Sequence, residues 1–133
     1  MAYITVTNTY PHPLDPWGSD SEGKQFALDL QAVVVAAGGA RPGECQIRFT
    51  GPDDVWLVAG GTPETHQAMR IEIALSPGLS PEAKQHLSES VLAFLRTKLR
   101  PTPDAEVHLS VEVRDLDGYT SHIEPAQDGP QDR

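Results

Sequence analysis

Residues 69–82, MRIEIALSPGLSPE, contain the pattern that decides the fold. Apolar and polar residues alternate up to Leu75, which is typical of a strand with one buried face. Ser80 then stands directly before Pro81, a favoured pair at the start of a helix, so the pattern predicts that a helix begins here. Residues 107–114, after that helix, alternate again. The second half of the chain is therefore predicted to be a β-α-β unit.

The first half of the chain repeats this order. Residues 3–7 and residues 45–50 each alternate as half-buried strands. Between them, Ser19 and Glu22 have the spacing of a capping box for a helix. A short apolar strand is also predicted at residues 55–58. The sequence thus predicts an α+β fold in which two β-α-β units form one four-stranded sheet, with both helices on one face.

The alternation within the strands also predicts a second, polar face of the sheet. This face is either exposed to solvent or lines a polar interior between subunits. A ferredoxin-like dimer with an antiparallel sheet has the same element order and is an alternative that strand directions decide. The polar face is expected to carry Thr5, Thr7, Arg48, Arg70, Glu72, His108, Glu112 and Arg114.

Length and charge limit the classes of function. The 133 residues correspond to about one domain, predicted at residues 1–123, and residues 124–133 have the composition of a flexible tail. A net charge of −9 opposes binding to nucleic acid or anionic lipid. No apolar stretch approaches the ~20 residues of a membrane span. The single cysteine, Cys45, excludes an intrachain disulfide and is interpreted as a small buried hydrophobe. We expect a cytoplasmic protein that binds neither nucleic acid nor membranes.

The sequence shows no motif typical of metal or cofactor binding. The five histidines never have the spacing of metal ligands. The Gly60-Gly61 pair has no phosphate-loop lysine beside it. We therefore expect no metal and no cofactor.

Several segments, in order, resemble the tautomerase superfamily. Residues 71–85, with the helix and the strand that follow them, resemble the second β-α-β unit of that superfamily. Residues 54–61, DVWLVAGG, are similar to the D-x-W-x-x-A-x-G stretch of its 5-carboxymethyl-2-hydroxymuconate isomerase branch. The resemblance covers residues 1–122 if the proline-rich loop is an insertion.

This resemblance implies a homotrimer with inward-facing sheets and an isomerase of small carboxylate-bearing enol or keto acids. In the family, an amino-terminal proline is the general base and arginines hold the substrate carboxylate. Ala2 stands at the position of that proline, while Arg48 and Arg70 are the candidate substrate-binding residues. Because Ala2 lacks the ring amine, we expect weak or altered activity. The alternative is a non-catalytic trimeric homologue that binds a ligand or serves as a scaffold.

The arginines of the polar face also have a competing interpretation. Arg48, Arg70 and Arg114 can belong to a solvated face, or to an inter-subunit salt-bridge face with Glu72 and Glu112, where individual pairs contribute little. Arg114 is expected to be of this kind. Arg70 lies two residues from Glu72 on the same face, so part of its charge is expected to be engaged. Arg48 has no acidic neighbour on its own strand, which makes it the first candidate for an anion site.

Overall fold

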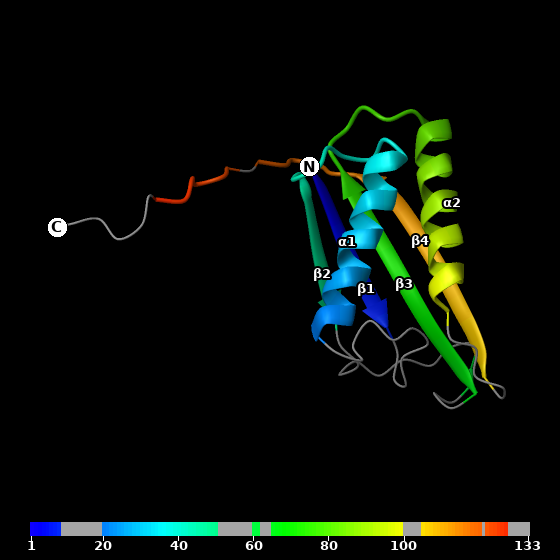
Figure 1. Cartoon of the computed structure of the whole chain (residues 1–133). Helices are drawn as coiled ribbons and strands as arrows, with labels where there is room; N and C mark the ends of the chain where they lie inside the picture. Colours follow the sequence, from blue (N-terminus) through cyan, green and yellow to red (C-terminus); the bar gives the residue numbers. More distant parts are fainter. Residues whose placement is uncertain (9–19, 51–59, 62–64, 100–104, 121, 128–133) are drawn as a thin grey trace.

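A computed structural model describes residues 1–8, 20–50, 60–61, 65–99, 105–120 and 122–127. The predicted cap at Ser19 and the predicted strand at 55–58 lie outside these residues. The described chain forms four strands and two helices (Figure 1). In chain order they are β1 (Ala2–Asn8), α1 (Asp20–Ala36), β2 (Cys45–Thr50), β3 (His66–Leu75), α2 (Pro81–Lys98) and β4 (Glu106–Asp115).

The four strands form one sheet in the order β2-β1-β3-β4. β1 is parallel to β2, β3 is parallel to β4, and the central pair β1 and β3 is antiparallel. Both helices lie over the same face of the sheet (Figure 1). The predicted pair of β-α-β units is confirmed. The ferredoxin-like alternative is wrong, because the two strands joined through each helix are parallel neighbours.

The core lies between the sheet and the two helices, as the alternation predicts. Burial of these apolar side chains supplies most of the driving force for folding. The largest fully buried apolar side chains come from both central strands and both helices: Ile4, Val6, Leu30, Val34, Met69, Ile71, Ile73, Leu75, Leu87 and Leu95.

The helix boundaries follow from local chemistry. Ser80 caps α2, because its Oγ accepts a hydrogen bond from the Ala83 backbone N–H at 3.1 Å. Beyond the end of α1, Gly38 adopts a positive φ of 83°. The backbone N–H of Gly39 then donates to the Val34 carbonyl at 2.9 Å, which satisfies one of the last helical acceptors.

The strands are longer than the sequence pattern indicates. β1 extends one residue beyond each end of the predicted stretch 3–7, because Ala2 and Asn8 both pair with β3. β3 begins at His66, ahead of the alternation that becomes visible at Met69. Gln67 interrupts the alternation of apolar and polar residues at the start of β3. It is polar, yet it lies on the helix-covered face and is 1% exposed.

Candidate functional site

The face of the sheet that the helices leave uncovered, here called the open face, carries the predicted polar residues. Register places Arg48, Thr5, Glu72 and Glu112 in one row across the sheet. The next row contains Arg70, paired with Thr7 on one side and with a serine of β4 on the other. The strand alternation therefore predicted this face correctly.

Arg70 is held by two carboxylates of the open face. Its Nε donates to Glu72 Oε1 at 2.8 Å, and a terminal nitrogen donates to Glu112 Oε1 at 3.2 Å. The hydrogen bond to Glu72 raises the pKa of Arg70, and the charges of both carboxylates act in the same direction. The expected engagement of Arg70 is confirmed, and its charge is largely compensated within the protomer.

Arg48 is exposed on β2 and forms no hydrogen bond or ion pair within the described part of the chain. Arg114 is exposed on β4, which is compatible with the expected solvated face, and forms no salt bridge with any described residue. Its register partner is Ala74, whereas Glu112 lies within reach of Arg70. A guanidinium without a carboxylate partner is suited to a small anion because it presents a planar fork of donors.

Ala2 is the first residue of β1. It pairs with Cys45 of β2 on one side and with Leu75 of β3 on the other. Its residue surface is 0% exposed, and its backbone N–H donates to the Glu44 carbonyl at 2.7 Å. With Met1 in place this nitrogen is an amide and has no basicity. The basic group at this end is the Met1 amino group.

The Met1 amino group lies in a small polar niche. It is 3.3 Å from Ser76 Oγ and 3.5 Å from Glu44 Oε2. Cys45 lies beside this niche and packs partly against the core. Burial raises the pKa of the Cys45 thiol, while the positive charge of the amino terminus lowers it to a smaller extent. The interpretation of Cys45 as a small buried hydrophobe holds in part, because the residue is half-buried beside the core. The sequence did not indicate its cationic neighbour, the amino terminus.

The three predicted site residues do not come together within one chain. Arg48 stands beside Thr5 and Arg70 beside Thr7, three and five residues along β1 from Ala2. At about 3.3 Å per residue, these rows lie about 10 Å and about 17 Å from Ala2. The Ala2 side chain also points to the helix-covered face. Within one chain, the three positions are therefore separated along the sheet.

Two tyrosines on the open face were missed by the sequence analysis. The hydroxyls of Tyr3 and Tyr119 are 2.9 Å apart, and their ring centroids are 5.5 Å apart at 72°. The hydrogen bond to Tyr119 raises the pKa of Tyr3, with burial as a smaller cause. Alternation along β1 placed Tyr3 on this face, but Tyr119 follows the last strand and carries no periodic signal.

A histidine cluster at the opposite end of the open face was also missed. His66 Nε2 and His108 Nε2 each lie 3.4 Å from Glu106 Oε2. The parallel register of β3 and β4 brings them together, and sequence spacing does not reveal such a register. Within the described residues, no group of three His, Cys, Asp or Glu side chains meets the geometry of a metal site.

Comparisons with known proteins place the fold. No family model and no curated protein matches the sequence. The structure is similar to that of a 5-carboxymethyl-2-hydroxymuconate isomerase from Deinococcus radiodurans R1, with a TM-score of 0.65 over 92% of this chain and 90% of that one. The identity is 15%. The fold is tautomerase-like.

Other tautomerase-like structures agree with this result. A member of the cis-3-chloroacrylic acid dehalogenase family matches with a TM-score of 0.65 and 18% identity, over 90% of this chain and 80% of that one. A malonate semialdehyde decarboxylase inhibited by 3-bromopropiolate matches with a TM-score of 0.51 and 14% identity, over 84% and 83%. These likenesses concern the fold. Neither described helix of the tautomerase-like chain is long and apolar enough to cross a membrane.

Proposed function

We propose that this protein is a tautomerase-superfamily homologue that acts, weakly or in an altered way, on small carboxylate-bearing enol or keto acids. The observation that carries the proposal is Arg48, an exposed guanidinium without a carboxylate partner on the open face of a tautomerase-like sheet. In a chain of net charge −9, a small carboxylate binds only where positive charge is locally uncompensated. Arg70 is the second candidate, and its charge is shared with Glu72 and Glu112.

The proposed site lacks the proline that would serve as its proton-transfer group. If Met1 is removed, the Ala2 nitrogen becomes a primary amine at the start of β1, beside the Glu44 carbonyl. An amine at a buried position has a lowered pKa, so that it accepts and returns a proton near neutral pH. Ala2 nevertheless lacks the rigid ring that a proline would place there. This difference is the reason for proposing weak or altered activity.

A homotrimer with inward-facing open faces completes the proposal. The rows of Arg48 and Arg70 lie about 10 Å and about 17 Å from Ala2 within one chain. An arginine of one protomer that faces the amino terminus of another removes this separation. The polar open face, which neither helix covers, supports such an arrangement.

The experiment measures tautomerisation of a phenylpyruvate-type keto acid. Intact mass first establishes whether the purified chain begins with Met1 or Ala2. Ala2→Pro with Met1 removed is then compared with the unsubstituted chain lacking Met1, which is the matched control. General acid–base groups contribute on the order of 10²-fold to 10⁴-fold, and the control keeps a primary amine at residue 2, so the proline variant is expected to be faster by part of this factor. Rapid turnover by the native protein would contradict the proposed role of residue 2.

A non-catalytic trimeric ligand-binding or scaffold protein is the second candidate. It is favoured by Ala2 itself, which is 0% exposed and whose nitrogen is engaged by Glu44 while Met1 is present. Such a protein would bind a keto acid in a calorimetric titration and show no turnover in either the native or the Ala2→Pro form. The two measurements together separate the candidates.

A further inference from the structure

The two helices differ in what they present away from the sheet. On α2, the outward face is polar and solvated, with exposed Glu82, Gln85, His86, Glu89 and Arg96. On α1, the exposed residues after Gln25 are Leu28, Ala32 and Ala36, one stripe at intervals of four residues. A helix that is apolar on its outward face as well as its inward face is typical of a helix covered on both sides. The outer face of α1 therefore exposes an apolar surface, whereas the outer face of α2 is polar and suited to solvent.

This stripe forms one wall of a shallow apolar groove of about 370 Å³. Leu28 is 49% exposed within it, and Pro42, which follows the helix, forms its far end. The described residues that line it, here called the α1 groove, are Leu28, Gln31, Ala32, Val35, Ala36 and Pro42.

At the carboxyl end of the described chain, an exposed segment carries a large apolar side chain. Residues 122–127, here called the C-terminal arm, are exposed throughout and form no hydrogen bond or ion pair with the rest of the described chain. Figure 1 shows the arm running away from the sheet and helices. Ile123 in this arm is 70% exposed. Ile123 and Leu28 are the exposed large hydrophobic residues of the described chain.

The arm and the groove match in length. From Leu28 to Ala36 the helix rises about 12 Å, at about 1.5 Å per residue. The four residues 123–126, Ile-Glu-Pro-Ala, span about 13 Å when extended. Pro125 favours the extended conformation in the residue before it. Three of these four residues are apolar, as the groove requires.

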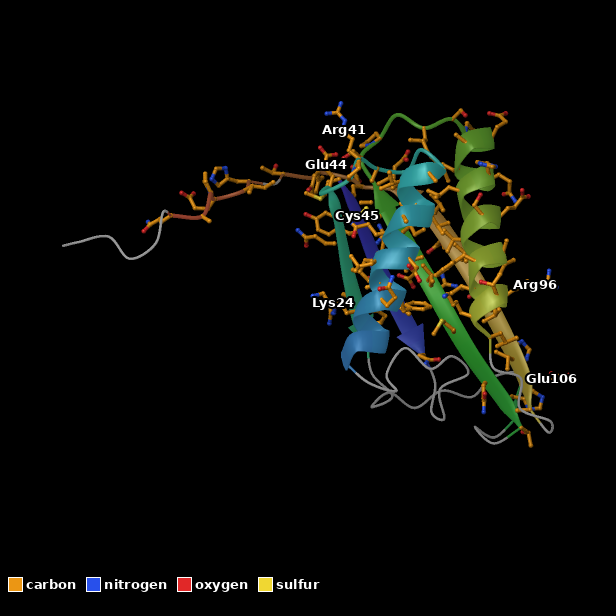
Figure 2. All side chains as sticks on the ribbon, in the orientation of Figure 1. Lys24, Arg41, Glu44, Cys45, Arg96 and Glu106 are labelled. Atoms are coloured by element: carbon orange, nitrogen blue, oxygen red, sulfur yellow. The ribbon has the colours of Figure 1, made fainter. Side chains whose placement is uncertain are left out.

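The arm and the groove also match in charge. Lys24 lies one helical turn before Leu28, and Arg41 directly precedes Pro42; both are exposed and form no ion pair within the described residues. Figure 2 shows Arg41 beyond the carboxyl end of α1 and Lys24 near the amino end. Glu124 in the arm provides a carboxylate next to Ile123, where its described partner is His122 at 2.9 Å.

We propose that the C-terminal arm of one chain docks in the α1 groove of a second copy, with Ile123 against Leu28 and Glu124 close to Lys24. The arm leads away from its own domain. Its direction therefore favours the groove of a second copy over the groove of the same chain. A head-to-tail contact of this kind forms a ring if the rotation between successive copies closes, and an open filament if it does not. The inference is independent of the proposed catalytic function.

The test is a disulfide between the two surfaces in a Cys45→Ala background. One chain carries Leu28→Cys, and a second chain with a different affinity tag carries Ile123→Cys. After co-expression and mild oxidation, intact mass is expected to show the covalent heterodimer as the main cross-linked species. Cross-linking no more frequent than that of Arg96→Cys with Ile123→Cys, the control pair on the solvated face of α2, would overturn the proposal.

The double variant Leu28→Cys/Ile123→Cys tests whether the arm folds back on its own groove. An intramolecular disulfide in a monomeric chain would overturn the proposal, whereas covalent oligomers support it.

A charge exchange provides an independent measurement. Lys24→Glu is expected to reduce the cross-linked fraction at least about fivefold, and adding Glu124→Lys to restore it, whereas Arg96→Glu, which changes the net charge equally, leaves it unchanged. Equal effects of Lys24→Glu and Arg96→Glu would contradict the proposed charge contact.

Discussion

Arg70 and Glu72, two residues apart on β3, form an ion pair on the open face with Nε and Oε1 2.8 Å apart. Glu112 of the neighbouring strand binds the same guanidinium at 3.2 Å. Arg70 is therefore charge-compensated before any ligand arrives. Arg48, in the adjacent row, has no such partner within the described chain. Of the two candidate arginines, Arg48 is the one available to a carboxylate.

The first prediction follows from this difference. Arg48→Ala is expected to weaken the binding of a small keto acid about 10-fold to 150-fold, which corresponds to about 1.5–3 kcal/mol for a charged hydrogen bond. Arg70→Ala is expected to have a smaller effect, because the Arg70 guanidinium is already engaged by Glu72 and Glu112. Isothermal titration calorimetry measures both, and Arg96→Ala on the outer face of α2 is the control. Unchanged affinity in Arg48→Ala would assign Arg48 to an ordinary polar surface.

The second prediction concerns the phenol of Tyr3. Because the hydrogen bond to Tyr119 raises the pKa of Tyr3 above its ordinary value of about 10, Tyr119→Phe is expected to lower it. The raised pKa means that this contribution to stability is present below pH 10 and is lost as the pH rises through the folded-state pKa. Tyrosinate absorbance in a Tyr10→Phe background measures the change. An identical alkaline titration of Tyr3 with and without the Tyr119 hydroxyl would show that this hydrogen bond does not control it.

Strand alternation was sufficient to predict which face each side chain occupies. The placement of Ile4 and Ile71 in the core, and of Thr5 and Glu72 on the open face, follows from a period of two. The cap at Ser80 follows from a local preference that needs no tertiary information. The right-handed crossover rule then supplies the parallel pairs and puts both helices on one face.

The side-chain contacts that the sequence did not reveal depend on pairing between distant segments. His66 and Glu106 meet because β3 and β4 share a particular register, and many registers are compatible with the same alternation. Tyr119 reaches Tyr3 across 116 residues of sequence from a segment without periodicity. Glu72 was named as a partner of Arg70, but only the register of β3 and β4 shows that Glu112 also reaches Arg70.

The third prediction tests the start of α2. Ser80→Ala removes the side-chain acceptor of the Ala83 N–H and is expected to lower the free energy of unfolding by about 1 kcal/mol. Ser90→Ala is the matched control, because the Ser90 Oγ donates to the His86 carbonyl within the helix and alanine is the better helix former. Urea unfolding of both variants measures the difference. A cost for Ser90→Ala equal to that for Ser80→Ala would show that capping is not the cause.

The fourth prediction concerns assembly. If open faces meet in a homotrimer, sedimentation velocity at micromolar concentration is expected to give three times the chain's 14.4 kDa. Ser110→Trp inserts a bulky ring beside Arg70, halfway along the edge strand β4 on the open face and away from the helix-covered core, and is expected to shift the protein toward monomer. Ala93→Trp, at an exposed position on α2, adds the same ring outside the proposed interface and is expected to leave the trimer intact. Circular dichroism of both variants checks that the fold is retained. A stable native monomer at this concentration would rule out the trimer, and with it any site shared between protomers.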